Sequence, residues 1–576
     1  MRGLRTANIF KRITDESSLR VSWLALVALA APVSHKVKMA WTVKGIPCGA
    51  LAVWSLMALA WVTILVADAA EDPPAPQAGQ VVFRTDFDTP EAREAWSHAP
   101  FANWERGYQG TTCLRITVSA DQAKGGSMIR LPLDLKRYRG CRLLFECMAK
   151  ADRVSKPAAA WNGVKFMLHY QSPTEGPQWH HPSGLFGTFN WQTLSFVAPI
   201  AMDALEGEID LGLQDCSGNV WFDSLSVTVY RGTPPRRPEP LSNPGPAFRG
   251  HDLPRLRGVM SPNTFRDEDL RVLGTEWKAN VIRWQITRNW GRAGTDRDLA
   301  EYDRWFEGKL KELDQALEAA QRYGIKVVVD MHSPPGGRYE NNDLAIFHEA
   351  LYQDHYVRLW EKIARRCEAN PAVWGYDLIN EPVQNRPSPA GVPDYLGTQV
   401  RAAKAIRVID PRVPIFIEAA EWDSAAGFRD LEPVAVPNVI YQVHMYVPSE
   451  FTHQGVYNQR TGIAYPGKIN GTTWDRERLR QVLRPVREFQ LAYNVHIYVG
   501  EFSAIRWAPG AADYLRDCIG LFEEYGWDWT YHAYREWDGW SVEHGSNPQD
   551  HTPSEEPTDR QKLLLSWFAR NEKPRR

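Results

Sequence analysis

Residues 326–380 carry the pattern that decides the fold of the C-terminal half of the chain. The apolar run KVVVDMH (326–332) precedes the amphipathic stretch HEALYQDHYVRLWEKIARRCEAN (348–370), and a second apolar run follows, VWGYDLIN (373–380). Short runs rich in β-branched and aromatic residues are typical of buried strands, whereas apolar residues at i, i+3 and i+4 are typical of helices. A strand, a helix and a second strand in this order predict parallel strands of one sheet.

The same alternation extends over the chain from Leu253 onward. Further helical patterns occupy residues 302–324 and 395–410. The other strand-like runs are LRGVM (256–260), VIRWQI (281–286), PIFIEAA (414–420), VIYQVHMY (439–446), HIYVGEF (496–502) and DWTYHAY (528–534). Eight candidate strands favour a closed TIM (β/α)8 barrel over an open sheet, and we assign this α/β domain to residues 251–576.

Residues 81–230 show a different pattern, with short apolar alternation broken by Gly, Pro and Asn. Strand-like runs are CLRITVS (113–119), RLLFECMAK (142–150), VKFMLHY (164–170), WQTLSFVAP (191–199), IDLGLQD (209–215) and VWFDSLSVTVY (220–230). Many short strands without a long helix predict an all-β sandwich or jelly roll. Pro-rich polar linkers at 71–80 and 231–250 flank this region. We therefore expect the sandwich to fold independently and not to be needed for the chemistry.

The N-terminal segment resembles a targeting signal. The uncharged run GALAVWSLMALAWVTILVA (49–67) follows Lys36, Lys38 and Lys44 and ends near Ala69. This order is that of a secretory signal peptide, and its 19 residues also suit a membrane-spanning anchor. Residues 1–70 are thus expected to be a signal or an anchor, with the rest secreted, periplasmic or extracellular, and in the second case held at a membrane.

The composition narrows the classes of function. Lys+Arg is 67 and Asp+Glu is 69, so no basic excess points to a nucleic-acid partner. The 24 Trp residues hint at sugar stacking, although most are expected in the core. Six cysteines follow the N-terminal segment and permit disulfides in about 15 pairings. The sequence contains no C-x-x-C motif, so a zinc site is not indicated. We expect a monomer without a cofactor or metal.

Chemistry in a TIM barrel takes place at the carboxyl ends of the strands. Polar or aromatic side chains end seven of the eight predicted strands: Arg283; Asp330 and His332; Asn380 and Glu381; Glu418, Glu421 and Trp422; His444 and Tyr446; Glu501; His532 and Tyr534. Taken alone, each Glu would usually be a solvated loop residue. Glu381 and Glu501, however, hold equivalent places on strands four and seven. Glycoside hydrolysis needs such a pair, one to protonate the leaving oxygen and one to meet the anomeric carbon.

At these positions the chain resembles glycoside hydrolase family 5, the cellulase family of clan A. The resemblance covers roughly Leu253 to Arg570. Its motifs are YDLINEP (376–382), IRW (282–284), DMH (330–332), VHMY (443–446) and VGEF (499–502). It implies retaining hydrolysis of a β-glucan or mannan type of polysaccharide, with Glu381 as acid/base and Glu501 as nucleophile. It also implies that Asn380 binds the sugar 2-hydroxyl, that Arg283 and Tyr446 keep Glu501 ionised, and that His332 and His444 line the −1 subsite.

One position departs from the family pattern. Many members have a Trp after strand eight, whereas His532 stands there in this sequence, with Trp537 or Trp540 available from the following loop. We expect His532, Trp537 and Trp422 to contact substrate. The sandwich resembles, more loosely, carbohydrate-binding modules of jelly-roll form, through GNVWFDSLSVTVY (218–230). Its candidate stacking residues are Trp161, Trp179 and Trp191, each of which could equally belong to the core.

Two other functions compete with this interpretation. The first is a non-catalytic glycan-binding protein with a decayed barrel, and the presence of both Glu residues and their supporting side chains argues against it. The second is a metal-dependent hydrolase that uses His332, His444, Asp330 and Glu501. No H-E-x-x-H or close ligand cluster supports it.

Overall fold

The computed structural model describes residues 75–159, 161–234, 236–457 and 460–574. Residues 75–576 form one compact unit. The predicted signal or anchor lies outside the described residues. Within these residues, no helix combines the length and the apolar character that a membrane crossing requires.

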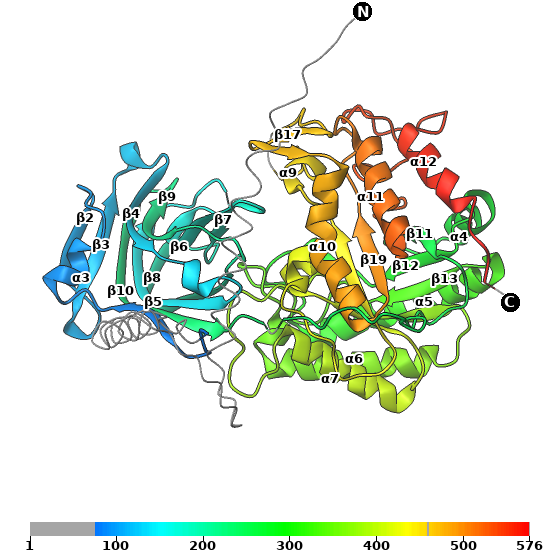
Figure 1. Cartoon of the computed structure of the whole chain (residues 1–576), viewed down its shortest axis with the longest axis horizontal. Helices are drawn as coiled ribbons and strands as arrows, with labels where there is room; N and C mark the ends of the chain where they lie inside the picture. The colour runs from blue at the N-terminus through cyan, green and yellow to red at the C-terminus, as the bar shows by residue number, and fades with distance from the viewer. Residues whose placement is uncertain (1–74, 160, 235, 458–459, 575–576) are drawn as a thin grey trace, which may run out of the picture. The chain divides into compact units, whose positions relative to one another are not determined.

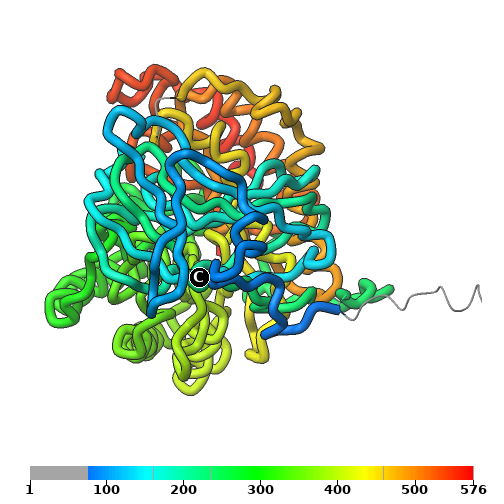
Figure 2. Tube along the Cα trace, turned by 90° about the vertical axis from the view of Figure 1, so that its left-hand side faces the viewer, coloured from blue at the N-terminus to red at the C-terminus, as the bar shows by residue number. Residues whose placement is uncertain are grey.

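Two antiparallel sheets form the N-terminal sandwich, as the alternating pattern predicts (Figures 1 and 2, blue through cyan to green). One sheet contains β1 (Val81–Thr85), β2 (Ala102–Arg106), β3 (Thr112–Val118), β5 (Arg142–Val154), β8 (Gly187–Pro199) and β10 (Gly218–Arg231). The other contains β4 (Gly126–Leu133), β9 (Gly207–Gln214), β6 (Gly163–Ser172) and β7 (Gly176–His180). Phe145 and Phe196 of the first sheet stack at 4.7 Å, and Phe166 of the second packs edge-on against Phe196.

Eight parallel strands close into a barrel, which confirms the predicted TIM fold (Figure 1). The strands are β11 (Arg257–Met260), β12 (Val281–Gln285), β13 (Lys326–Asp330), β14 (Val373–Asp377), β15 (Ile415–Glu418), β16 (Val439–Met445), β19 (Ile497–Phe502) and β20 (Asp528–Tyr531). β11 pairs with both β12 and β20, and this pairing closes the ring.

Helices connect most of the strands. They are α5 (Leu299–Tyr323), α6 (Ala350–Cys367), α7 (Tyr395–Ile409), α10 (Arg476–Tyr493) and α11 (Ala511–Tyr525), with a short α4 (Asp267–Arg271) after β11. A further helix, α12 (Asp559–Phe568), follows the last strand. Asp298 caps the start of α5, and Gly324 ends it with φ +69°. The connection after β15 differs, because residues 420–438 contain only the short α8 (Ala420–Asp423) and a 3-10 turn (Ala425–Phe428).

The barrel interior changes from apolar to polar along the strands. Alternate residues of a strand face the same side. An apolar cluster contains Val281, Val328, Phe416 and Ile440, among others. Two residues further along the same four strands come Arg283, Asp330, Glu418 and Gln442, all buried. The alternation explains how charged side chains occur within apolar runs, and it places them next to the carboxyl ends of the strands.

The sandwich and the barrel also touch directly. The backbone N–H of Val197 on β8 donates to the carbonyl of Asn385 at 2.6 Å. Arg429 of the barrel lies 2.7 Å from Glu175 of the sandwich. Residues 232–256, described except for residue 235, contain no helix or strand. Arg237 within them donates to the carbonyl of Pro485 at 2.9 Å.

All six cysteines in the described part of the chain are buried free thiols. The even number of cysteines is therefore not used for disulfides in this structure. They serve as small apolar side chains, as buried Cys commonly does.

Candidate active site

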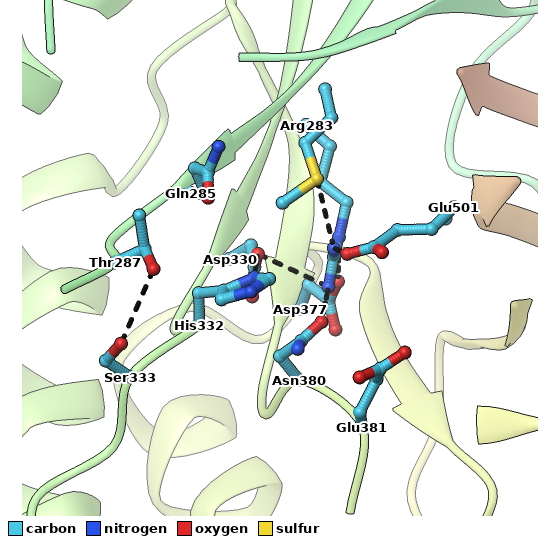
Figure 3. Close-up of polar contacts among 12 residues, drawn as sticks. Arg283, Gln285, Thr287, Asp330, His332, Ser333, Asp377, Asn380, Glu381 and Glu501 are labelled. Atoms are coloured by element: carbon cyan, nitrogen blue, oxygen red, sulfur yellow. Dashed lines mark hydrogen bonds and ion pairs between the residues drawn. The ribbon is translucent and has the colours of Figure 1, made fainter. Parts of the chain in front are cut away.

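Arg283 organises the polar layer of the barrel (Figure 3). Its side chain is fully buried on β12, and the planar guanidinium reaches five groups on or just after four other strands. Its contacts are Asp377 Oδ2 at 2.8 Å, Glu501 Oε1 at 2.5 Å, Asn380 Oδ1 at 3.1 Å, Glu418 Oε1 at 3.2 Å and Asp330 Oδ2 at 3.3 Å. A buried guanidinium needs polar partners, and these five oxygen atoms supply them for Arg283.

Glu501 at the end of β19 is held as a carboxylate. Its Oε1 accepts from Arg283, and its Oε2 accepts from the Tyr446 hydroxyl at 2.8 Å. Burial by itself would raise the pKa of Glu501. The nearby charges of His444, His532, Arg283 and His332 outweigh burial, so the pKa falls well below its ordinary value. These charges thus favour the ionised form of Glu501.

Glu381 follows the end of β14 and has a left-handed backbone, with φ +50°. Its N–H donates to Glu418 Oε2 at 2.6 Å, and its Oε1 lies 3.2 Å from Nδ1 of His444. Arg338 donates to the carbonyl of Glu381 at 3.0 Å. The Glu381 side chain is 21% exposed, against 6% for Glu501. The two carboxylates thus differ in both hydration and charged neighbours.

Further buried acids surround Arg283. Burial is the main cause that raises the pKa of Asp377 to about 6, and Arg283 opposes it. Burial, followed by neighbouring carboxylates, raises the pKa values of Glu418 and Asp423 well above the ordinary range. Gln442 donates to Asp377 at 3.0 Å and also to Glu418. Several carboxylates thus share one guanidinium, and the raised pKa values of Asp377, Glu418 and Asp423 shift these three acids toward their neutral forms.

Two histidines border the carboxylate pair. His332 lies with Nδ1 2.9 Å from Asp330, and its pKa is raised because Asp330 outweighs the opposing effect of burial. His532 lies with Nε2 3.3 Å from Glu536, which also accepts from Gln285 at 2.9 Å. Burial opposes the imidazolium, but Glu536 and Glu501 raise the pKa of His532 to about 9. His532 therefore adds a positive charge close to Glu501.

Aromatic side chains follow the ends of several strands. Trp540 is buried, with its ring 5.6 Å from that of His532 and 6.3 Å from that of Tyr446. Four others are more than 40% exposed and follow β12, β15, β16 and β20: Trp290, Trp422, Tyr457 and Trp537. Trp422 lies over the guanidinium of Arg338 at 4.9 Å, and Trp537 lies 5.8 Å from Trp540.

The structure brings the predicted site residues together. Direct contacts link Arg283, Asn380, Glu381, His444, Tyr446 and Glu501, and His332 joins them through Asp330. His532 packs edge-on against Tyr446 at 6.1 Å. Trp422 reaches the group through Arg338, and Trp537 through Trp540.

Sequence reasoning missed other members of the network: Gln285, Arg338, Asp377, Asp423, Gln442 and Glu536. A signal existed for Asp377, Gln285 and Gln442, because each is a polar residue inside an apolar strand. Arg338 and Glu536 lie in loops and Asp423 ends the short α8, where no periodicity marks them.

The metal alternative fits this site poorly. Glu381, His444 and Glu501 do offer ligand atoms within 4.8 Å of one another. The guanidinium of Arg283, however, lies 2.5 Å from Glu501 Oε1, and the charge of His532 is close by. These positive charges disfavour a cation between the carboxylates.

An eight-stranded barrel whose strand ends bring two carboxylates together defines a class, the barrel glycoside hydrolases. The family description Cellulase (glycosyl hydrolase family 5) matches residues 246–540, just over half of the 576 residues. The chain belongs to this family, and it is a glycoside hydrolase that acts on β-glycans.

Two relatives matched by sequence agree with the family assignment. Endoglucanase C of Acetivibrio thermocellus is 27% identical over 271 residues, which cover 41% of this chain and 76% of that protein. Cellodextrinase A of Ruminococcus flavefaciens is 25% identical over 250 residues, covering 42% and 70%. Among solved structures, Thermotoga maritima Cel5A in complex with cellobiose, in mutant form, aligns with TM-score 0.43 and 21% identity over 56% of this chain and 99% of that one.

Proposed function

We propose that the protein is a retaining endo-β-glycanase in which Glu381 is the acid/base and Glu501 the nucleophile. The spacing of the carboxylates carries this proposal. An oxygen of Glu381 and an oxygen of Glu501 lie within 4.8 Å of each other. Retaining enzymes hold their carboxyl groups about 5–5.5 Å apart, whereas inverting enzymes need roughly 6.5–9.5 Å to admit a water molecule.

The first step forms a covalent intermediate. Glu501 attacks the anomeric carbon while the bond to the leaving oxygen breaks, and Glu381 gives its proton to that oxygen. The product is an ester between Glu501 and the sugar, together with a free glycan end. Arg283 and Tyr446 support this role because they hold Glu501 ionised and fix both of its oxygens.

The second step returns the enzyme to its starting state. Glu381, now a carboxylate, takes a proton from water, and the oxygen of that water attacks the anomeric carbon and displaces Glu501. Two inversions give net retention. His444 supports the double role of Glu381, because its Nδ1 at 3.2 Å can donate to the carboxylate form.

The substrate we propose is a polymer of the β-glucan or mannan type. The exposed aromatic residues follow β12 and β20 as well as β15 and β16, which lie on opposite sides of the ring of strands. Flat rings on both sides of the carboxylates suit a chain that extends past the cleavage point in both directions. The relatives named endoglucanase and cellodextrinase support the β-glucan assignment.

A polysaccharide panel tests this proposal. Cellulose oligomers, mixed-linkage β-glucan, mannan and xyloglucan would be incubated with the enzyme, with sizing of the products and NMR of the first anomeric proton formed. We expect medium-length products from a β-glucan or mannan and a β-configured new end. A first product of the opposite anomeric configuration would overturn the retaining assignment, and single sugars released from the start would overturn endo action.

We also propose that the sandwich binds glycan. Trp179 on β7 is 55% exposed and stacks in parallel on the ring of His169 at 5.3 Å. Asp210 on β9 is buried beside Arg130, at 3.2 Å. A flat aromatic ring next to paired polar groups suits a sugar ring and its hydroxyls. Affinity electrophoresis in gels containing β-glucan should show less retardation for Trp179→Ala than for the wild type, and equal mobility would contradict the proposal.

A further inference from the structure

The connection after β15 joins the sandwich to the carboxylate site. We call residues 419–431 the β15 loop. Within it, Glu421, Trp422 and Asp423 have φ values of +61°, +64° and +51°, three consecutive left-handed residues with side chains. Such a conformation is sparsely populated for L-residues and persists only where surrounding contacts hold it. The contacts of the β15 loop must therefore hold it in this conformation.

One side of the loop supports Glu381 by two routes. Asp423 accepts from the N–H of Ala419 at 2.7 Å, and its Oδ2 lies 3.9 Å from Nε2 of His444. The other ring nitrogen of His444 is 3.2 Å from Glu381 Oε1. In the second route, Trp422 covers the guanidinium of Arg338, which donates to the carbonyl of Glu381.

The other side of the loop is held by the sandwich. Arg142, the first residue of β5, donates from Nη2 to Glu421 Oε1 at 2.9 Å and to Asp430 Oδ1 at 3.1 Å. Its Nε donates to the second oxygen of Asp430. The Arg142 side chain is only 15% exposed and that of Asp430 10%, so this fork-like pair is largely shielded from water. Arg142 thus binds the β15 loop at two residues, Glu421 before Trp422 and Asp430 after it.

We infer that Arg142 is a positioning residue, through which the sandwich fixes the β15 loop and thereby the general acid Glu381. This inference rests on the proposed function of Glu381. It differs from the expectation that the barrel works without the sandwich, because the carboxylates of Glu421 and Asp430 find their partner in Arg142 of the sandwich. A second sandwich arginine, Arg231, lies farther from Asp430, at 3.9 Å. Removal of one partner of a buried ion pair leaves the other uncompensated.

Leaving-group dependence in the full-length enzyme tests the inference. The substrates are a natural β-glycan, whose leaving oxygen needs a proton, and a dinitrophenyl β-glycoside, whose leaving group does not. Arg142→Ala should lower kcat/KM for the glycan by roughly 10- to 100-fold, the scale of a misplaced catalytic group. The loss on the dinitrophenyl glycoside should be much smaller. Arg142→Lys should restore part of the activity, since an ammonium can reach one of the two carboxylates.

Two matched variants complete the kinetic test. Arg115→Ala removes another sandwich arginine, one paired with Glu105 at 3.3 Å on the adjacent strand, and should leave both rates unchanged. An equal loss on both substrates in Arg142→Ala, or no loss, would overturn the inference. Glu381→Gln is measured in parallel, and if it lacks leaving-group dependence, the proposed function fails instead.

Hydrogen–deuterium exchange distinguishes a failure of the inference about Arg142 from a failure of the proposed role of Glu381. In Arg142→Ala, amides of residues 419–431 should exchange faster than in the wild type and in Arg115→Ala. Unchanged exchange in this loop would overturn the positioning role of Arg142, whatever the role of Glu381.

Discussion

Nη1 of Arg283 lies 2.5 Å from Oε1 of Glu501, although 218 residues separate them in the chain. The same guanidinium also contacts Asp330, Asp377 and Glu418. Arg283 therefore supplies positive charge to several carboxylates of the barrel interior at once, and it is one of the groups that lower the pKa of Glu501. The different environments of Glu501 and Glu381 lead to different expectations for their variants.

Replacement of the proposed nucleophile, Glu501→Ala, should abolish hydrolysis. The cavity left by the carboxylate can admit a small anion, so added azide should restore turnover and give a glycosyl azide of inverted configuration. The measurement is product NMR with an activated glycoside. Glu488→Ala, an exposed glutamate on α10, serves as the control and should keep wild-type activity. Wild-type rates in Glu501→Ala would show that this assignment is wrong.

Replacement of the proposed acid/base, Glu381→Ala, should behave differently. Activity on natural glycan should fall by about 10²–10⁴-fold, the usual contribution of general acid–base catalysis. With an activated leaving group the first step needs no acid, so a glycosyl-enzyme on Glu501 should accumulate and appear as a burst. Stopped-flow release of the leaving group and intact mass spectrometry would detect it. Steady release without a burst or a mass increase would argue against this role.

Tyr446→Phe should move the acid limb of the pH profile upward. Tyr446 donates to Glu501 at 2.8 Å and so stabilises its charged form. The pKa of Glu501 in the folded protein lies below its ordinary value. Ionised Glu501 therefore stabilises the fold at pH values above the pKa of the unfolded chain, and this stabilisation is lost as the pH falls through the pKa of the folded protein. Loss of one hydrogen bond to a charge should raise this pKa by about one unit. The acid limb of kcat/KM against pH gives the shift, and an unmoved limb would contradict the expectation.

His532 should remain protonated above neutral pH. Its folded pKa of about 9 lies above the ordinary 6.5, so the stabilising charge pair is fully present below pH 6.5 and is lost as pH rises through 9. NMR of labelled histidine should find this titration near pH 9, and Glu536→Gln should shift it to lower pH. His532→Ala should lower turnover, and it should also lower stability below pH 9, because the buried Glu536 loses its charged partner. Unchanged kinetics would assign His532 a structural role only.

We propose export of the chain, on the basis of the charged and then apolar segment that ends near Ala69. The N-terminal sequence of the mature protein should begin near residue 70 if the segment is a cleaved signal. An intact membrane-bound form would identify an anchor instead. Recovery of an uncleaved form in the cytoplasm would contradict export in either form.

Most of the barrel could be predicted from sequence, because its strands are buried on both faces and read as apolar runs. All eight predicted runs contain a strand of the closed barrel. The sandwich was predicted less completely. β5 alternates buried and half-buried residues and is visible as a pattern, whereas β2 and β7 bury none of their residues. A strand without a buried face has no apolar period to detect.

The sequence by itself determined the barrel, the order of its strands and the positions of Glu381 and Glu501 at strand ends. These features follow from local sequence, because the apolar pattern of a strand is visible within the strand itself. The rule that barrel sites lie at the carboxyl ends of the strands likewise needs no knowledge of long-range contacts. The protonation of each carboxylate was decided only by the tertiary structure, because a pKa depends on burial and on charges contributed by several strands at once. The same is true of Arg142, which meets Glu421 across 279 residues of chain. No local pattern records that contact, because it exists only after two separately predictable domains have packed together.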